Sequence, residues 1–233
     1  MAENTRTTGL GAGPEDIDLV IDGAKPLTLA TVAAVTAVCD RVEERAGSGR
    51  VVLRLGGVPG GTWAADLTVS LVSKWERALR RLERLPAATI AIADGDCGGT
   101  ALDAMLAADY RIATTSVRLV VPVGGGATWP GMALYRISQH GATAAAIRRA
   151  VLFGTPVDAG DALALHLLDE LTEDVTEALA TVALRAGGIS GTELAIRRQL
   201  MADAATTSFE EALGVHLAAV DRTLRRAVAG AAS

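Results

Sequence analysis

The sequence predicts an α/β protein followed by a helical region. Short segments of β-branched or alternating residues recur between longer amphipathic segments as far as about residue 175. Beyond that point the apolar residues follow a helical period alone, with glycine breaks at Gly187, Gly188 and Gly191. A chain of 233 residues that is 50% apolar is long enough to bury a full core. We therefore expect an α/β core over residues 15–175 and a C-terminal helical region over 176–233.

The first half of the core alternates strands and helices. Residues 17–22 alternate as a strand, and a helical pattern with Thr28 as a plausible N-cap follows to about residue 46. A β-branched strand over 50–55 ends in glycines, and an amphipathic helix is expected over 66–85, before Pro86. Its buried stripe contains Leu71, Trp75, Leu79 and Leu82.

The same alternation continues through the second half. A short strand over 89–93 leads into a glycine-rich turn over 95–99 and a helix over 100–108. Two more strands and three more helices complete the core, at 110–113 and 117–121 and at 132–139, 143–152 and 158–165. The C-terminal region is rich in alanine and amphipathic, so its apolar face should be covered by the core or by a neighbouring subunit.

Composition argues against several classes of function. A net charge of −5 and an aromatic content of 3% do not fit a nucleic-acid-binding surface. Cys39 and Cys97 form no C-x-x-C pair, and His140, His166 and His216 have no metal-ligand spacing. We expect no disulfide framework, no metal and no redox cofactor.

The N-terminal residues 1–14 are polar and lack the features of a signal peptide, so we expect them to form a disordered tail. Charged residues such as Arg54 and Asp94 interrupt the apolar runs before they reach the length of a membrane span. The sequence therefore predicts a soluble, cytoplasmic protein that does not bind membranes.

Two loops, at residues 60–67 and 95–101, each join a strand to a helix with small residues. Glycines let a ligand approach the main chain, and the free N–H groups of a helix's first turn point toward it. Two such helix starts converging on one carbonyl oxygen would form an oxyanion hole. By their glycines alone, the loops could equally be ordinary strand-to-helix turns.

The order of these elements resembles the crotonase superfamily of enoyl-coenzyme A hydratases and isomerases, over residues 15–175. Residues 64–67, Ala-Ala-Asp-Leu, are similar to that family's Gly-Ala-Asp-Leu element, with Ala64 in place of the glycine. Asp94 replaces the asparagine of an Asn-Gly turn, and residues 129–131, Trp-Pro-Gly, stand where Ile-Pro-Gly is expected. Residues 153–158 and 161–162 resemble the later Leu-Thr-Gly and Asp-Ala elements.

The resemblance implies a fold, a ligand and an assembly. The fold would be a crotonase-type spiral of ββα units, with C-terminal helices that form a homotrimer or a hexamer. The ligand would be an acyl-CoA, with coenzyme A as part of the substrate and no separate cofactor. The backbone N–H groups of Ala65 and Thr100 would form the oxyanion hole, and Thr100 replaces a glycine. Residues expected to line the substrate site are Trp63, Ala64, Asp66, Leu67, Gly99 and Val123.

Some of these residues have a second interpretation. Trp63 and Trp129 could line an acyl pocket or simply pack in the core. Asp66 could contact substrate or cap the helix that follows it. Cys97 or Thr100 could in principle act as a nucleophile with His140 as its base, but no acid is placed to orient that histidine.

Asp103 occupies the position of the family's first catalytic glutamate, within an apolar helix. We expect a semi-buried carboxyl group there, with a pKa raised toward neutrality, which suits a general acid or base. Compensation of the helix dipole is the alternative. The second catalytic glutamate should follow Pro122, where this chain has Val123. Hydration by two opposed carboxylates is therefore disfavoured, and stabilisation of a thioester enolate remains.

Within the superfamily, the short chain and the altered catalytic positions most resemble the small crotonase homologues of actinomycete glycopeptide clusters, which make dihydroxyphenylacetyl-CoA. This resemblance implies a dehydratase-type lyase that acts on a cyclised polyketide-CoA. The alternative is a catalytically weak accessory subunit that assists a polyketide synthase or a second crotonase.

Overall fold

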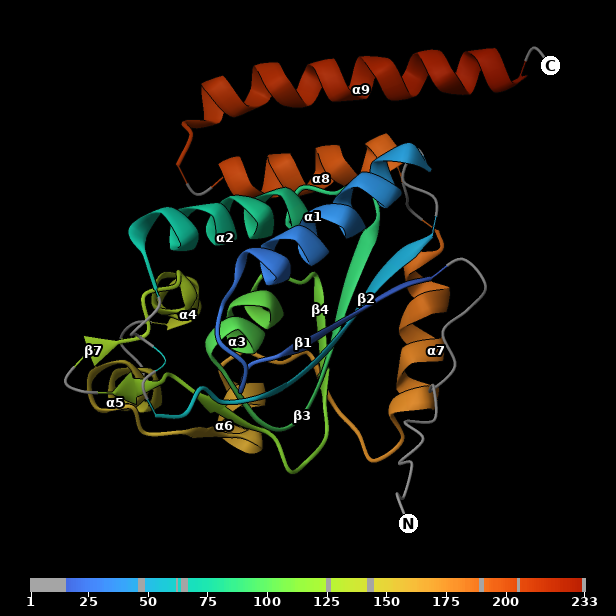
Figure 1. Ribbon diagram of the computed structural model, residues 1–233. Helices are drawn as coiled ribbons and strands as arrows, with labels where there is room; N and C mark the ends of the chain where they lie inside the picture. Colours follow the sequence, from blue (N-terminus) through green and yellow to red (C-terminus); the bar gives the residue numbers. More distant parts are fainter. Residues whose placement is uncertain are drawn as a thin grey trace.

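The computed structural model describes residues 16–45, 49–61, 63, 67–124, 127–141, 145–188, 191–204 and 206–231. Strands and helices alternate along the chain, as the sequence predicts (Figure 1). The strands are β1 (Ile17–Asp22), β2 (Arg50–Gly57), β3 (Ala88–Gly98), β4 (Tyr110–Ala113), β5 (Arg118–Val120), β6 (Val123–Gly124), β7 (Ala127–Thr128), β8 (Val157–Asp158) and β9 (Glu170–Leu171). The helices are α1 (Leu29–Glu44), α2 (Val69–Leu82), α3 (Gly99–Leu106), α4 (Ala133–Gly141), α5 (Ala145–Phe153), α6 (Ala159–Ala164), α7 (Val175–Ala186), α8 (Gly191–Asp203) and α9 (Phe209–Ala231).

The main sheet has the strand order β1-β2-β3-β4-β9, and each neighbouring pair in this order is parallel. β3 is the long central strand. It pairs with β2 along one edge, and its other edge is divided between β4 and β5. Its first half, Ile90–Ala93, pairs with β4, whereas Asp96–Gly98 pairs with β5. The prediction of a turn over 95–99 was therefore wrong. Residues 95–98 belong to β3, where β5 pairs with Asp96–Gly98 on one side and Gly57 of β2 pairs with Cys97 on the other, and Gly99 opens α3.

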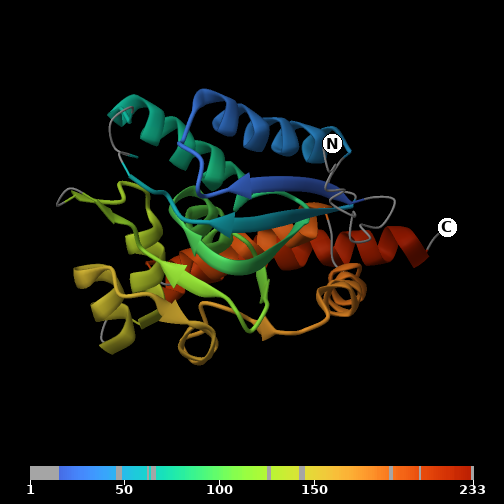
Figure 2. The same cartoon turned by 60° about the horizontal axis from the view of Figure 1, so that its bottom comes forward.

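Alternating side chains of β2 and β3 divide the core into two layers. Val51 and Leu53 point into the larger cluster with α1, α2 and α3, whereas Val52 points into a smaller cluster with Ile90 and α7. Accordingly α1 and α2 lie on one side of the sheet and α7 on the other (Figures 1 and 2). A sheet that is covered on both faces explains why its central strands are apolar on both faces.

The beginnings of two helices test the predicted caps. Thr28 is the N-cap of α1, and its hydroxyl accepts a hydrogen bond from the N–H of Thr31 over 3.2 Å, which confirms the prediction. The helix expected from Asp66 begins instead at Val69, because the hydroxyl of Thr68 accepts from the N–H of Leu71 over 3.1 Å. Leu67 and Thr68, which the prediction placed in the helix, therefore lie before it.

The C-terminal region has two parts. α7 packs on the sheet through Ala178, Leu179 and Val182, so it shares the core of the preceding elements. α8 and α9 lie side by side beyond it, outside the layered part of the molecule (Figure 1). The side chain of Arg198 connects α8 to the core, with bonds to the carboxylate of Asp109 and to the carbonyl oxygens of Leu85 and Ala87. Among the described residues, no helix combines the length and apolarity needed to cross a membrane.

Candidate active site

The segment that follows β2 meets the first turn of α3, which begins directly after β3. Parallel pairing places Gly57 beside Cys97, so both strands end at the same edge of the sheet. Gly99, which opens α3, has φ +55°, and a Cβ on it would lie 2.4 Å from Cγ of Pro59. Only glycine fits both the left-handed backbone and this close approach. The segment after β2 and the start of α3 are therefore neighbours at this edge, whereas residues 62 and 64–66 of the predicted 60–67 loop lie outside the described residues.

Thr100 lies in the first turn of α3 and is 1% exposed. Gly98, the N-cap, makes no side-chain hydrogen bond to the turn. The first N–H groups of a helix have no partner within that helix, and they carry the positive end of its dipole. The N–H of Thr100 is thus suited to bind a carbonyl oxygen. Ala64, Ala65 and Asp66 lie outside the described residues, so the first oxyanion donor stays a prediction.

Other predicted site residues gather nearby. The rings of Trp63 and Trp129 lie 5.3 Å apart between centroids, at an interplanar angle of 53°. The Trp63 indole also lies against Gly124, where a Cβ would be 2.8 Å from its Nε1. Val123 precedes that glycine and is 53% exposed, and Leu67 is half-buried. Trp63 and Trp129 therefore pack against each other beside the strand that carries Val123.

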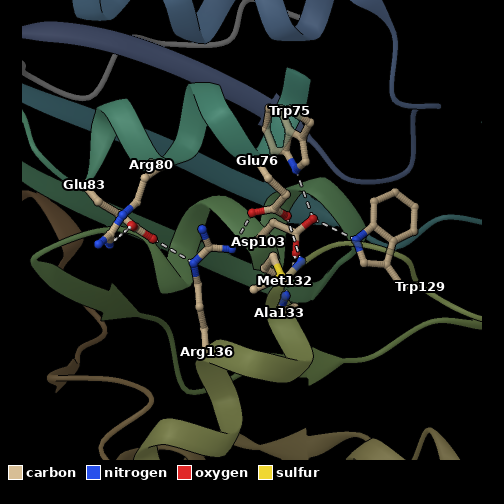
Figure 3. A network of polar contacts seen from close by, with 9 residues as sticks. All are labelled: Trp75, Glu76, Arg80, Glu83, Asp103, Trp129, Met132, Ala133 and Arg136. Carbon is tan, nitrogen blue, oxygen red and sulfur yellow. Dashed lines mark hydrogen bonds and ion pairs between the residues drawn. The ribbon is translucent and has the colours of Figure 1, made fainter. Parts of the chain in front are cut away.

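Asp103 departs from the semi-buried position that we expected, because its side chain is 0% exposed. Its Oδ2 accepts hydrogen bonds from the indole N–H groups of Trp75 and Trp129, over 3.0 and 2.7 Å, and its Oδ1 accepts from the N–H of Ala133 over 3.0 Å (Figure 3). Every residue of α3 is buried, and α4 begins directly over this carboxyl group, which explains the enclosure. A proton-transfer role for Asp103 stays a prediction.

Burial is the largest cause that raises the pKa of Asp103, to about 7, and the nearby Glu76 carboxylate acts in the same direction. The two indole N–H groups and Arg136 oppose the rise, since each favours the charged carboxylate. The expectation of a carboxyl pKa near neutrality is thus met, but in a group without contact to solvent.

A second carboxylate, Glu76 on α2, supports the same helix start. It accepts from the N–H of Met132 over 2.7 Å and pairs with Arg136 over 3.0 Å. Arg136 also bonds Glu83 over 2.8 Å, so three side chains fasten α4 to α2 (Figure 3). Sequence reasoning missed this network. Its signal was Trp75 in the buried stripe together with Trp129, because a buried indole N–H requires an acceptor.

Further features of the described residues are the cysteine in β3, the side chains of types that bind metals and one cavity. Cys97 is fully buried, and burial raises the pKa of its thiol to about 12, so a thiolate does not form at neutral pH. Across the described ranges, no three histidine, cysteine or carboxylate side chains gather as metal ligands. A cavity of about 680 Å³ lies between α8 and the sheet, and its lining includes none of the predicted site residues.

The chain is similar to known proteins at two levels. It is 53% identical over 211 residues to an enoyl-CoA-hydratase of Amycolatopsis orientalis, covering 91% of this chain and 97% of the relative. No family model matches.

Solved structures share its fold at low identity. An enoyl-CoA hydratase of Mycobacterium smegmatis matches with a TM-score of 0.77 at 18% identity, over 90% of this chain and 87% of its own. An enoyl-CoA hydratase/isomerase from Marinobacter aquaeolei matches with a TM-score of 0.77 at 16% identity, over 92% and 90%. The fold is thus that of the crotonases. With the sequence relative, these findings show that the chain belongs to the enoyl-CoA hydratase, or crotonase, superfamily.

Proposed function

We propose that this chain is a dehydratase-type lyase that binds an acyl-CoA and stabilises the enolate of its thioester. The observation that carries the proposal is the start of α3, where Thr100 is 1% exposed in the first helical turn and the preceding Gly99 packs against Pro59 of the segment that follows β2. Donors fixed in a dry site stabilise a developing oxyanion more strongly than water does. Ala65 is the second donor of the proposal.

The proposed reaction is loss of water from a cyclised polyketide-CoA toward dihydroxyphenylacetyl-CoA. In the proposed step a water molecule accepts a proton from the carbon next to the thioester, the resulting enolate is held by the two N–H groups, and hydroxide departs from the neighbouring carbon. The proton and the hydroxide together make the water that is released. The step requires no metal and no redox cofactor. Formation of an aromatic ring lowers the barrier, which suits a site with Val123 where a second carboxylate would stand.

The choice of substrate rests on the short chain and on the replacement of catalytic positions, which most resemble the small crotonases of glycopeptide clusters. The name of the Amycolatopsis relative, an enoyl-CoA-hydratase, supports action on an acyl-CoA. We further propose a homotrimeric or hexameric, cytoplasmic protein. Exposed apolar side chains on α9, such as Phe209 at 74% and Leu224 at 61%, support burial of that helix in an assembly.

A second candidate function, that of an accessory subunit without catalytic activity, is favoured by the burial of Asp103. Asp103, the carboxylate at the first catalytic position, is fully buried and accepts three hydrogen bonds. A site without an accessible acid or base could hold a thioester without converting it. The chain would then be an accessory subunit that binds the acyl-CoA for a polyketide synthase or for a second crotonase.

Mass spectrometry of the purified protein with a hydroxylated cyclic acyl-CoA of polyketide type separates the two functions. Loss of water at a rate proportional to the protein concentration supports the lyase. Tight binding without loss of water supports the accessory subunit and rules out the lyase for that substrate. Absence of both binding and turnover would contradict the proposed acyl-CoA site. A protein-free incubation measures the spontaneous rate of dehydration.

A further inference from the structure

Asp103 is the centre of a cluster that contains every tryptophan of the chain. The sequence has three tryptophans, and two of them, Trp75 and Trp129, donate to the same oxygen of Asp103. The third, Trp63, packs on Trp129. Figure 3 shows the two indoles converging on the carboxylate from α2 and from the segment that precedes α4.

The fit around this carboxylate is close. A Cβ on Gly131 would lie 2.3 Å from Oδ2 and 2.6 Å from Oδ1 of Asp103, and 2.5 Å from Nε1 of Trp129. The chain between Trp129 and α4 therefore passes directly over the carboxyl group, and both oxygens are occupied by N–H donors. A group enclosed in this way cannot reach a bound substrate without displacing α4.

Trp129 lies between Asp103 and the segments that are proposed to line the acyl pocket. Its backbone N–H donates to the carbonyl of Pro122 over 3.0 Å, which ties it to the chain just before Val123. Its ring contacts Trp63, whose indole lies against Gly124. Trp129 is thus in contact, through backbone and ring, with both segments expected to line the acyl pocket.

Glu76, a second carboxylate of the network, bonds different partners from those of Asp103. Glu76 bonds the N–H of Met132 and the guanidinium of Arg136, so it also holds the start of α4. Among the described contacts Glu76 makes no bond to an indole, whereas Asp103 accepts from two. Asp103 and Glu76 both accept hydrogen bonds from the start of α4, whereas of these two only Asp103 accepts from indoles in the described contacts. Its contacts with the indoles, Trp129 among them, therefore distinguish Asp103 from Glu76.

We propose that Asp103 is a positioning residue, which fixes the Trp129 indole and, through the Trp129–Trp63 pair, the wall of the acyl pocket formed by Val123 and Gly124. This inference rests on the proposed acyl-CoA site. It differs from proton transfer by Asp103 because it requires a hydrogen-bond acceptor at residue 103 and does not require an ionisable group.

Two substitutions at Asp103 separate the roles. Asp103→Asn keeps a carbonyl oxygen that can accept from both indoles but removes the ionisable group. Asp103→Leu keeps the branched shape and removes every acceptor. Positioning predicts that Asp103→Asn preserves the geometry of the tryptophan pair and that Asp103→Leu loses it. Proton transfer predicts instead that both substitutions abolish turnover equally and leave binding of the thioester unchanged.

Circular dichroism of the paired indoles provides the first measurement, since coupled aromatic rings at this separation give a paired signal that depends on their orientation. We expect this signal to remain in Asp103→Asn and to fall by at least half in Asp103→Leu. The measurement needs no ligand, so it decides the positioning role even if the proposed function fails. An unchanged signal in Asp103→Leu would overturn the proposal.

The affinity for acetyl-CoA, measured by calorimetry, is the second measurement. We expect a dissociation constant within about threefold of the wild type for Asp103→Asn and weakened at least tenfold for Asp103→Leu. If Asp103→Leu does not fold, Trp129→Phe and its matched control Trp75→Phe decide the question, since each removes one N–H from the same oxygen. Only Trp129→Phe should weaken binding, and equal effects of the two would overturn the proposal. Failure of the wild type to bind acetyl-CoA would count against the proposed function alone.

Discussion

The indole N–H of Trp129 donates to Oδ2 of Asp103 over 2.7 Å, inside the protein and at the start of a helix. The carboxyl group at a position expected to transfer protons is thereby enclosed among N–H donors. Because such a group titrates with a raised pKa, its protonation is linked to the stability of the fold.

Stability should fall as the pH rises toward neutrality. Burial raises the pKa of Asp103 from 3.8 to about 7, so between these values the folded protein keeps a proton that the unfolded chain has lost. The stability that the protonated Asp103 contributes to the fold is present in full below pH 3.8 and is lost as the pH rises through 7. At about 1.4 kcal/mol per pKa unit, the shift of the pKa from 3.8 to about 7 corresponds to about 4 kcal/mol of unfolding free energy. Urea unfolding between pH 4 and 8, compared with Asp103→Asn, isolates this effect. If the unfolding free energy changed equally with pH in the wild type and in Asp103→Asn, the linkage to Asp103 would be contradicted.

Removing the N–H of residue 100 should slow the proposed dehydration. Proline is tolerated in the first turn of a helix and has no N–H, so Thr100→Pro deletes the donor at the start of α3. We expect kcat to fall by about 100-fold or more, as for the loss of an oxyanion donor elsewhere. Thr100→Ala, which keeps the N–H, is the matched control and should stay near the wild-type rate. Thermal unfolding of both variants checks that they fold, and similar rates would rule out the donor role.

A methyl group at residue 131 should be destabilising. In Gly131→Ala the new Cβ would approach Oδ2 of Asp103 to 2.3 Å, and overpacking of this kind costs about 1 to 3 kcal/mol. Gly160→Ala in α6 is the control, because its nearest described neighbour, Oδ1 of Asp158, is 3.5 Å away. Alanine should be neutral or slightly stabilising there. Denaturant midpoints measure both effects, and equal midpoints would show that the segment over Asp103 can move aside.

The attachment of the C-terminal helices should depend on Arg198. Its side chain is 10% exposed and bonds Asp109 together with the carbonyl oxygens of Leu85 and Ala87. In Arg198→Ala the carbonyl oxygens of Leu85 and Ala87 lose this donor, while Asp109 still accepts from Thr89, so we expect faster hydrogen exchange in α8 and a loss of about 2 kcal/mol in unfolding free energy. Arg197→Ala is the matched control, since Arg197 is 58% exposed and pairs only within its helix in the described contacts. Unaltered exchange in Arg198→Ala would contradict an anchoring role.

Local patterns in the sequence predicted most of the secondary structure. Thr28 caps α1 as expected, because a hydroxyl next to the first helical turn needs only its own neighbours to bond. Of the predicted stripe on α2, Trp75, Leu79 and Leu82 are buried and Leu71 is half-buried, since helical periodicity determines which side chains share a face. The resemblance to the crotonases, built from motifs in order, led to the superfamily that the comparisons show.

Where distant segments meet, only the tertiary structure decided the outcome. Residues 95–98 look like a turn in isolation, yet pairing with β5 and Gly57 makes them a strand. Asp103 fits its catalytic motif by spacing, but its burial depends on Trp75, Trp129 and α4, which come from other parts of the chain. The sequence by itself determined most of the elements, their order and the types of side chain in the expected site. Whether a side chain is buried depends on packing between segments that are far apart in the sequence, which a local pattern does not encode. For Asp103 that packing decided that the carboxyl group lies in the interior and not at the surface.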